Sequence, residues 1–468
     1  MGKAARLFNG NGDQTLIARV TPSQDQREFL QTQWNALAEH LKMKLYENYG
    51  YPISTWLQGS YKYGTLIRPV HLGEEYDVDV GVYFQWDGDE EIVPTAKQLR
   101  DWTQQELHDY KKINSDVRRI EDPAKERCSR AVFEKQFHID TPVYHLNVDT
   151  DKRRLACLSD KWEESDPKVI YKWFKEAVGE KERDQLRRLV RYLKAWAAVS
   201  FDGMQDSRPS SILLTVLATD AYNDLWLRRL WDALEDDEAL IAVIKIVHVR
   251  LFENKTVPNP VDPNENLNRI SDEAWDGFLQ RLQALRDIAE RALEAADEAA
   301  ASLIWSEAFS FLMPLPEADE VEVVDSSGRA LMVLPNIQVD VYARKPERHM
   351  ATHMNEVPSV AKNCDLKFRI TNPHVVPQYA NIEWTVRNAG QEAELVGDLG
   401  HSRRKATGYE AEESTAYIGK HYMDCVIRLN GNVVALRRVP VNVRSTEYPA
   451  RNPPRPAYTK IQSQLRKR

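Results

Sequence analysis

The sequence predicts an α+β protein built of more than one domain, and three observations lead to this prediction. Alternating apolar and polar residues at 76–84 and 137–148 predict β-strands in the first third of the chain. A mostly helical pattern follows from 166 to about 311. Several short alternating segments after residue 363 predict a separate β-sandwich. The length of 468 residues also exceeds one ordinary hydrophobic core.

The changes of pattern divide the chain into four parts. Residues 1–165 form a mixed α/β core, in which 25–48 has the apolar spacing of an amphipathic helix. Residues 166–345 form a helical lobe that ends in returning strands, and 363–445 form the β-sandwich. The last part, 446–468, is rich in proline and charge and poor in apolar residues, which is typical of a flexible tail.

Composition excludes several classes of protein. No apolar run approaches the roughly 20 residues that span a bilayer, and the start lacks the apolar core of a signal peptide. We therefore expect a cytoplasmic protein with no transmembrane segment. The four cysteines lie far apart with no CxxC spacing, which argues against a zinc site and against a disulfide scaffold. A net charge of −8 argues against a general duplex-binding surface.

Two aspartates in the first predicted strand are the main chemical signal. Asp77 and Asp79 are two residues apart, so both side chains leave the same face, whereas Val78 and Val80 point to the other. Neighbouring carboxylates are compatible with bound Mg²⁺, or Mn²⁺ as an alternative, together with substrate phosphates. Two such ions, ~3.5–4 Å apart, activate an attacking hydroxyl and stabilise a leaving pyrophosphate. Asp140, in the next predicted strand, is the expected third carboxylate.

A glycine-containing loop precedes these strands. Gly59 and Ser60 lie just before an expected helix start, where backbone N–H groups and a hydroxyl can hold a triphosphate. Taken singly, an Asp-x-Asp strand is most often a solvated sheet face, and a Gly-Ser pair is commonly just a turn. The ordered set of loop, paired aspartates and lone strand aspartate favours nucleotidyl transfer. A second pair, Asp149 and Asp151, lies in an expected turn, where we expect the side chains to face solvent.

The motifs GSYKYGT, EYDVDVGVYF and HIDTPVYH resemble those of the CD-NTases. These enzymes are bacterial relatives of cyclic GMP-AMP synthase within the DNA polymerase β-like superfamily, and the resemblance covers roughly residues 50–345. It implies a polymerase β-like nucleotidyltransferase core that holds two Mg²⁺ ions. The implied nucleotide-binding residues are Gly59, Ser60, Lys194 and Ser211, and the implied catalytic and metal-binding residues are Asp77, Asp79 and Asp140. For Lys194 the alternative to nucleotide binding is a solvated charge on a basic helix face.

The segment 363–444 resembles the sensor-like AGS-C domain that is fused behind some of these enzymes. The resemblance implies ligand contact for Trp384, Tyr417 and His421. Packing in a core is the alternative for Trp384 and Tyr417.

The tail resembles that of Hailong-type defence nucleotidyltransferases, in which a C-terminal tyrosine primes a linear DNA oligomer. Tyr458 and Tyr448 are then the candidate primers, whereas a basic proline-rich tail is usually only disordered.

We therefore expect a template-independent, Mg²⁺-dependent nucleotidyltransferase that makes a short oligonucleotide signal in anti-phage defence. A linear DNA oligomer primed on a tyrosine is the first option for its product, and a cyclic di- or trinucleotide is the alternative. The expected partners are ATP, dATP or other nucleoside triphosphates and a separate effector protein, for which a membrane-bound form is one option. A silent nucleotide sensor would need a broken aspartate triad, and RNA tailing would favour a more basic body.

Overall fold

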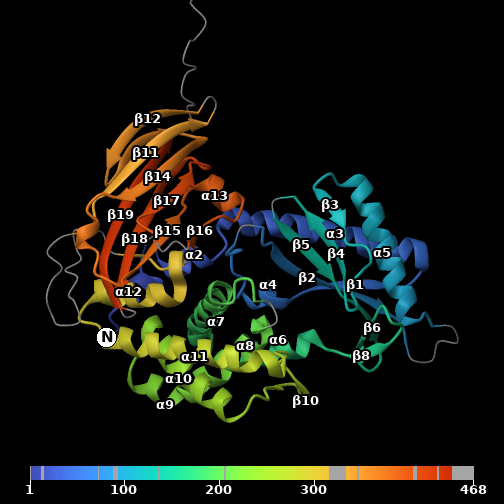
Figure 1. The fold of residues 1–468 in the computed structure, drawn as a ribbon. Helices are drawn as coiled ribbons and strands as arrows, with labels where there is room; N and C mark the ends of the chain where they lie inside the picture. Colours follow the sequence, from blue (N-terminus) through green and yellow to red (C-terminus); the bar gives the residue numbers. More distant parts are fainter. Residues whose placement is uncertain are drawn as a thin grey trace, which may run out of the picture. The chain divides into compact units, whose positions relative to one another are not determined.

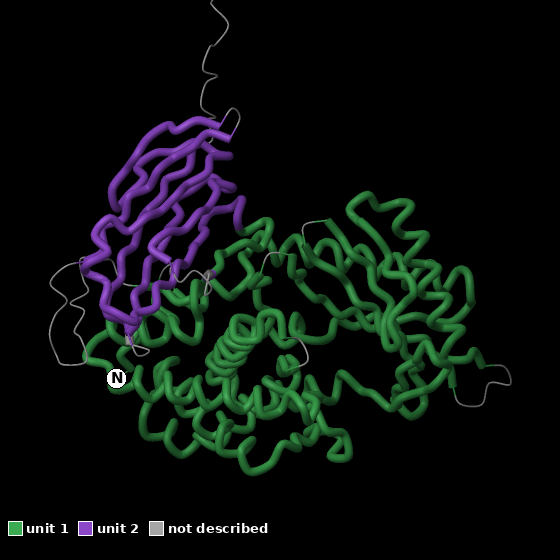
Figure 2. Tube along the Cα trace, viewed as in Figure 1, with its two compact units in different colours: residues 1–321, 394–401 green, residues 322–393, 402–468 purple. Residues whose placement is uncertain are grey.

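The computed structural model describes residues 2–11, 15–71, 73–87, 93–134, 136–204, 207–315, 334–344, 347–403, 408–429 and 432–444. The chain divides into two compact units, coloured separately in Figure 2. Unit 1 comprises residues 1–321 together with 394–401, and unit 2 comprises 322–393 and 402–468. Within the described ranges, no helix is both long and apolar enough to cross a membrane.

Unit 1 contains an eight-stranded sheet among its described residues, in the order β3-β4-β5-β2-β6-β7-β8, with β1 also paired to β2 (Figure 1). Helices α3 and α5 cover one face of this sheet, where Leu41 and Leu99 pack in one buried cluster with Val80. The opposite face carries Asp77 and Asp79 and, further along β2, a small buried cluster of Tyr83, Tyr144 and Leu155. The bounds of these elements are β1 Ile53–Gln58, β2 Tyr76–Gln85, β3 Val117–Ile120, β4 Ser129–Phe133, β5 Phe137–Thr141, β6 Val143–Asn147, β7 Lys152–Ala156, β8 Trp162–Glu164, α3 Gln24–Tyr49 and α5 Ala96–Ile113.

Helix α3 has clear local start and stop signals. The Ser23 hydroxyl accepts from the Gln26 N–H, and the Gln26 side chain accepts from the Ser23 N–H, which forms a capping box. The helix ends at Gly50, whose φ of +80° is readily adopted by glycine. The amphipathic helix expected at 25–48 is therefore confirmed.

The second part of unit 1 is a helical lobe with a buried core of its own. The helices are α6 Pro167–Glu176, α7 Glu180–Ser200, α8 Ser211–Asp224, α9 Trp226–Trp231, α10 Asp236–Glu253, α11 Asp272–Leu293 and α12 Glu298–Phe309, and a short hairpin joins β9 Pro258–Asn259 to β10 Asp262–Asn266. The N-terminal helices α1 (Ala5–Asn9) and α2 (Leu16–Val20) also pack in this lobe, although the sequence pattern groups them with the first core. The ring of Phe8, for example, makes edge contacts with Tyr192 and Trp305 at centroid distances of 5.1 and 5.2 Å.

The segment 394–401 belongs to unit 1, although the chain on both sides of it belongs to unit 2. The side chain of Gln26 donates to the Glu394 carbonyl at 3.0 Å, and Arg19 donates to the Leu399 carbonyl at 3.1 Å. Arg68 forms an ion pair with Glu394 at 3.3 Å. Three side chains of unit 1 therefore hold this segment.

Unit 2 is the β-sandwich that the sequence predicts. Two sheets, β12-β11-β14-β17 and β13-β19-β18-β15-β16, share one buried core that includes Phe368 and Trp384. The sequence pattern groups 337–345 with the helical lobe, but β11 pairs with β14 in the first of these sheets. An alternating pattern identifies a strand without identifying its partner strand. The bounds are β11 Ile337–Arg344, β12 Glu347–Met354, β13 Val357–Ala361, β14 Cys364–Ile370, β15 Asn381–Arg387, β16 Gly400–Arg403, β17 Glu410–Ser414, β18 Gly419–Leu429 and β19 Asn432–Arg444.

Candidate active site

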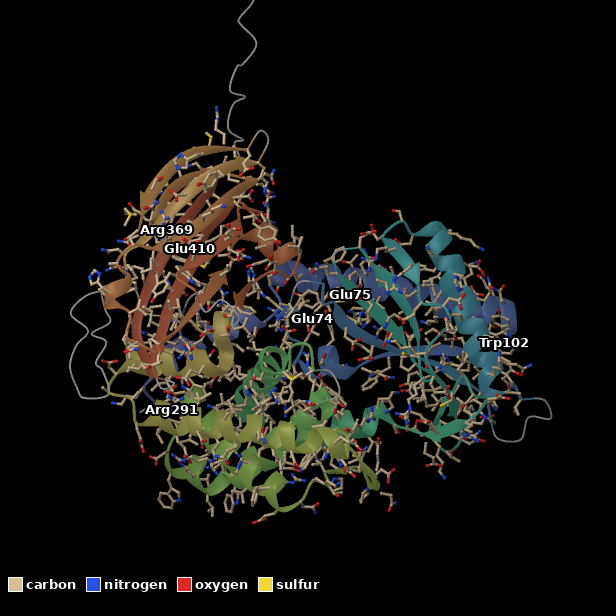
Figure 3. All side chains as sticks on the ribbon, in the orientation of Figure 1. Glu74, Glu75, Trp102, Arg291, Arg369 and Glu410 are labelled. Carbon is tan, nitrogen blue, oxygen red and sulfur yellow. The ribbon has the colours of Figure 1, made fainter. Side chains whose placement is uncertain are left out.

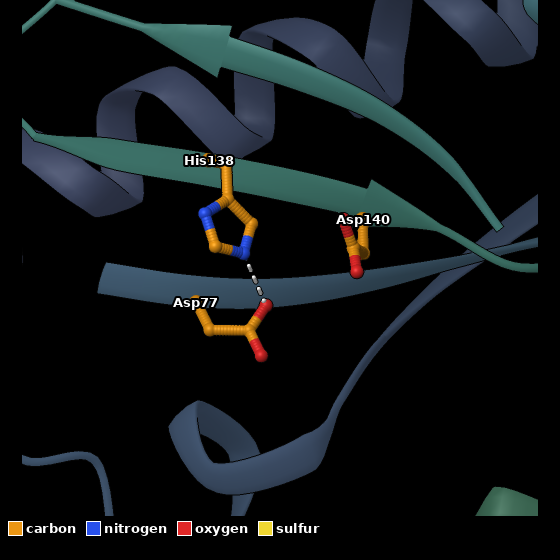
Figure 4. A group of neighbouring side chains, drawn as sticks. All are labelled: Asp77, His138 and Asp140. Atoms are coloured by element: carbon orange, nitrogen blue, oxygen red, sulfur yellow. Dashed lines mark hydrogen bonds and ion pairs between the residues drawn. The ribbon is translucent and has the colours of Figure 1, made fainter. Parts of the chain in front are cut away.

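The strand register of unit 1 brings the three aspartates together. Strand β2 is parallel to β5, with Asp77 beside His138 and Asp79 beside Asp140. Because side chains alternate along a strand, all four project from the same face of the sheet. Ligand atoms of Asp77, His138 and Asp140 lie within 4.8 Å of one another (Figure 4). The side chain of Val78, between the two aspartates of β2, is fully buried on the opposite face.

The Gly-Ser loop lies directly beside this group. Strand β1 is antiparallel to β2 and pairs Gln58 with Asp79, so Gly59 follows at the end of β1 that lies beside the aspartates. Gly59 opens the short helix α4 (Gly59–Tyr63) with a φ of +61°, and a Cβ atom there would lie 2.0 Å from Oδ2 of Asp79. Glycine is required on both counts. Ser60 follows within α4, and its side chain is partly exposed.

His138 lies between two carboxylates. Its Nε2 is 3.0 Å from Oδ1 of Asp77, and its Nδ1 is 2.9 Å from Oε2 of Glu75. Glu75, labelled in Figure 3 next to Glu74, immediately precedes β2. The imidazole therefore fixes the orientation of Asp77 in the way that an outer-shell partner fixes a metal ligand.

Asp140 is held by groups from β4 and the residues just before it. Arg130 donates to both oxygens of Asp140, at 2.5 and 2.7 Å. The thiol of Cys128 donates to Oδ2 at 3.3 Å. Burial raises the pKa of Cys128 to about 12, with a further contribution from the Asp140 charge, so this thiol keeps its proton at neutral pH.

Asp79 carries the clearest electrostatic signature of the group. Burial, and then the negative charges of Asp77 and Asp140, raise the pKa of Asp79 well above its usual range. The surroundings therefore disfavour the charged form of Asp79, whereas Asp140 has Arg130 as its counter-ion. An oxygen-rich donor set that includes such a carboxylate fits a divalent cation. Such a cation would be held by Asp77, Asp79 and Asp140.

The helical lobe contributes Lys194. This side chain is only 5% exposed, and its Nζ lies 3.1 Å from the Thr65 carbonyl and 3.4 Å from the Thr65 hydroxyl. Burial lowers the pKa of Lys194 to about 7, with a further contribution from the charge of Arg191, while Asp77 and Asp79 oppose the shift. The alternative of a solvated helix face is therefore wrong for Lys194. Its partner belongs to the loop that follows α4.

Two further cations of α7 contact the same loop. Arg187 donates to the carbonyl of Tyr63 at 3.0 Å, and Arg191 donates to the carbonyl of Leu66 at 3.3 Å. Together with Lys194 they occupy positions i, i+4 and i+7 of one helix face. This face of α7 therefore fixes the loop that begins at Gly59.

A cleft of about 1420 Å³ opens beside this group. Gln58, Gly59 and Asp79 line it on the side of the sheet. Ile212 lines it from the first turn of α8, next to the exposed Ser211. Asn259, in the β9–β10 hairpin, lines it as well. The volume exceeds the ~300–1,000 Å³ of a typical small-ligand pocket.

The other residues singled out from the sequence lie in a turn of unit 1, in unit 2 or outside the described residues. Asp149 is exposed, and Asp151 accepts from Arg153 at 2.6 Å in the expected turn. In unit 2, Trp384 is buried and donates to the Gly408 carbonyl at 3.1 Å, as its core alternative predicts. His421 is buried, and its ring nitrogens lie 3.3 Å from the Ala389 N–H and 2.9 Å from the Tyr417 carbonyl. Tyr448 and Tyr458 lie outside the described residues.

Arg130 and the role of His138 were not predicted from the sequence. A signal for His138 was present, because it precedes Asp140 by two residues and therefore shares its face of the strand. For Arg130 there was none, because its position opposite Asp140 depends on the antiparallel register of β4 and β5. Charged strand residues are common, and their cross-strand partners are not visible in the sequence.

This combination of sheet, aspartate group, glycine loop and helical lobe defines a nucleotidyltransferase of the DNA polymerase β type. Residues 53–144 match the family model described as "Cyclic GMP-AMP synthase DncV-like, nucleotidyltransferase domain". Residues 321–444 match "Adenylyl/Guanylyl and SMODS C-terminal sensor domain". The cyclic GMP-AMP synthase of Escherichia albertii is 30% identical over 413 residues, which cover 88% of this chain and 89% of that protein. The chain therefore belongs to the CD-NTase family and carries a C-terminal AGS-C domain.

Two further comparisons agree with this assignment. The c-di-GMP synthase of Roseivirga ehrenbergii is 27% identical over 252 residues, covering 47% of this chain and 62% of that protein. The crystal structure of the Vibrio cholerae DncV cyclic AMP-GMP synthase superposes with a TM-score of 0.56 at 19% identity, covering 67% of this chain and 98% of that chain. The likeness to DncV supports the fold, and the chain is a nucleotidyltransferase.

Proposed function

We propose that this enzyme joins two nucleoside triphosphates into a cyclic dinucleotide. The observation that carries the proposal is the placement of Asp77, Asp79 and Asp140 on one sheet face beside Gly59, with Gly59 and Asp79 lining a large cleft. The relatives named above are cyclic dinucleotide synthases, which favours the cyclic product over the linear oligomer. The grouping of all three carboxylates argues against a silent sensor.

In this proposal the donor triphosphate lies along the loop at Gly59 and Ser60, with Lys194 and Ser211 on its phosphates. Gly59 allows the phosphates to approach the backbone because no side chain stands in the way. Ser211 opens the 14-residue helix α8, whose N-terminal N–H groups favour negative charge. A phosphate would replace the Thr65 oxygens as the partner of Lys194 and would favour its charged form.

The reaction itself is a displacement at the α-phosphorus. A ribose hydroxyl of one nucleotide forms the new P–O bond, the α–β P–O bond breaks, and pyrophosphate leaves. Two Mg²⁺ ions, with Mn²⁺ as an alternative, supply positive charge for the attacking oxygen and the leaving group. Asp77, Asp79 and Asp140 would together hold the ions, and Asp140, nearest the attacking hydroxyl, would also accept its proton. A second round on the same two nucleotides closes the ring and releases a second pyrophosphate.

We also infer a role for the product as a signal in anti-phage defence, acting on a separate effector. The AGS-C match supports this inference, because a sensor domain joined to a nucleotidyltransferase suits a regulated messenger. Cells that express the enzyme and its genomic neighbours should resist phage, and cells with Asp77→Asn and Asp79→Asn should not. Equal resistance in both strains would contradict the inference.

The product is tested with purified protein, Mg²⁺ and labelled ATP, GTP, CTP, UTP and dATP in pairs. A cyclic product has no terminal phosphate, so it resists phosphatase and migrates free of protein. A product that shifts on phosphatase treatment, or that is released only by protease, would favour the linear oligomer instead. The Asp77→Asn, Asp79→Asn double variant is the control and should release no pyrophosphate.

A further inference from the structure

Arg130 holds the third aspartate in a way that conflicts with the metal role proposed for it. The two strands pair Arg130 with Asp140, and the guanidinium takes both carboxylate oxygens at 2.5 and 2.7 Å. A bidentate, charge-assisted pair of this kind is among the stronger polar contacts in proteins. Both side chains are largely buried, with 18% and 11% of their surfaces exposed, so water screens the pair only weakly.

A divalent cation cannot share Asp140 with this guanidinium at no cost. A cation bound to either oxygen would lie within a few ångströms of the Arg130 charge, and the two would repel. Lys125, whose Nζ is 4.0 Å from Oδ2, adds to the repulsion. Arg130 must therefore withdraw from at least one oxygen before Asp140 can act as a metal ligand.

A second acceptor for Arg130 is already in place. Oε2 of Glu121 lies 3.6 Å from the same Nε that contacts Asp140. Glu121 follows β3, and its N–H donates to the carbonyl of Arg130 at 2.9 Å, so it stands on the opposite side of Arg130 from Asp140. The guanidinium can therefore turn from one carboxylate to the other without movement of β4.

We propose that Arg130 is an exchangeable counter-ion for Asp140: it neutralises the aspartate in the metal-free enzyme and moves to Glu121 when a cation binds. The inference rests on the metal role of Asp140 in the proposed function. Arg130 acts through Asp140 and is a positioning residue. Because Arg130 competes with a cation for Asp140, the affinity of the site for free cations is weakened. The site therefore fills mainly when a nucleotide brings metal with it.

The test is titration of the nucleotide-free, full-length protein with Mn²⁺, followed by electron paramagnetic resonance. Arg130→Gln should bind Mn²⁺ roughly tenfold more tightly, because Asp140 loses its competitor. Glu121→Gln should bind it several-fold more weakly, because Arg130 loses its second acceptor. The double variant should behave like Arg130→Gln, because Glu121 acts only through Arg130. Arg119→Gln and Glu134→Gln, exposed residues of the same region, are matched controls that should leave the affinity unchanged.

Several outcomes would overturn the exchange. A purely structural Arg130 predicts weaker Mn²⁺ binding in Arg130→Gln and no effect of Glu121→Gln. If Arg130→Gln does not fold, as judged by circular dichroism, Glu121→Gln and Arg130→Lys decide, and unchanged affinity in both refutes the proposal. Wild-type protein that binds no Mn²⁺, with or without a non-hydrolysable triphosphate, would instead refute the metal role of Asp140 and with it the proposed function.

Discussion

Gly59 shows how a single missing side chain shapes the site. Its φ is +61°, and a Cβ atom at this position would lie 2.0 Å from Asp79, so no other residue fits. Gly50 also has a positive φ, of +80°, but a Cβ there would meet no atom within 4 Å. A comparison of the two glycines therefore separates the cost of an unusual backbone conformation from the cost of displacing the Asp79 carboxylate.

We expect Gly59→Ala to reduce turnover by roughly 100-fold, because a shift of about 1 Å in a reacting group costs that much. Gly50→Ala should lower the free energy of unfolding by about 1 kcal/mol and leave turnover intact. Initial rates of pyrophosphate release and urea unfolding of both variants check the pair. Equal loss of activity in the two variants would show that backbone strain alone is responsible.

The buried charge of Lys194 destabilises the folded protein, and we link this effect to its proposed role in binding phosphate. Because burial lowers its pKa to about 7, the folded protein holds this proton less tightly than the unfolded chain does. The cost of burying the charge is therefore fully present below pH 7 and disappears as the pH rises toward the ordinary lysine value. A group that destabilises the resting fold is typical of a functional site.

Lys194→Met should accordingly raise the free energy of unfolding by about 1–3 kcal/mol at pH 6 and by less at pH 9. It should also raise the KM for nucleotide more than it lowers the turnover rate. Urea unfolding at the two pH values checks the first effect, with Lys172→Met, on the exposed side of α6, as the control. A variant that is less stable than wild type at pH 6 would contradict the assignment.

At the scale of elements, helix α7 acts as a support for the loop after Gly59. Arg187, Arg191 and Lys194 each donate to one of its carbonyls. The loop in turn closes on itself, since the N–H of Thr65 donates to the carbonyl of Ser60 at 2.9 Å. The helical lobe therefore sets the shape of the loop after Gly59 as well as one wall of the cleft.

We expect Arg187→Gln to accelerate amide hydrogen exchange in residues 59–66 by roughly tenfold, which corresponds to the loss of about 1.4 kcal/mol of local stability. Mass spectrometry of peptic peptides measures the rate. Arg183→Gln is the matched control, because Arg183 lies on the same helix but donates to the carbonyl of Lys175. Unchanged exchange in the Arg187 variant would show that α7 does not support the loop.

Sequence reasoning succeeded where the signal is local to one element. The shared face of Asp77 and Asp79 follows from the two-residue period of a strand, and the apolar spacing of 25–48 identifies helix α3. It failed where a partner from another element decides. The burial of Lys194 depends on the Thr65 oxygens, and the position of Arg130 depends on a strand register. Neither contact leaves a periodic trace in the chain.

At the scale of the whole molecule, the two candidate products differ in which hydroxyl accepts the first nucleotide. A cyclic dinucleotide begins from free nucleotide and needs no tethered hydroxyl. A linear oligomer primed on Tyr458 or Tyr448 would need the segment that follows Arg444. The relatives support the first option, and a truncation separates the two.

We expect protein that ends at Arg444 to make cyclic product at a rate within roughly twofold of wild type, since no tethered acceptor is required. Liquid chromatography with mass spectrometry measures the product, and intact-protein mass spectrometry looks for adducts. Tyr458→Phe is the point-variant control. A nucleotide ladder on the wild-type protein that is absent from both variants would restore the priming hypothesis.

The return of residues 394–401 to unit 1 has a consequence for how such genes recombine. A crossover near residue 321 would place the AGS-C region behind a different catalytic region, as if the two were separate modules. The transplanted chain would still carry Glu394 and Leu399, whose partners are Arg19, Gln26 and Arg68. A host enzyme without these side chains would leave the segment unanchored. Functional chimaeras should therefore come from parents that share these residues, and inheritance of the two regions should be linked.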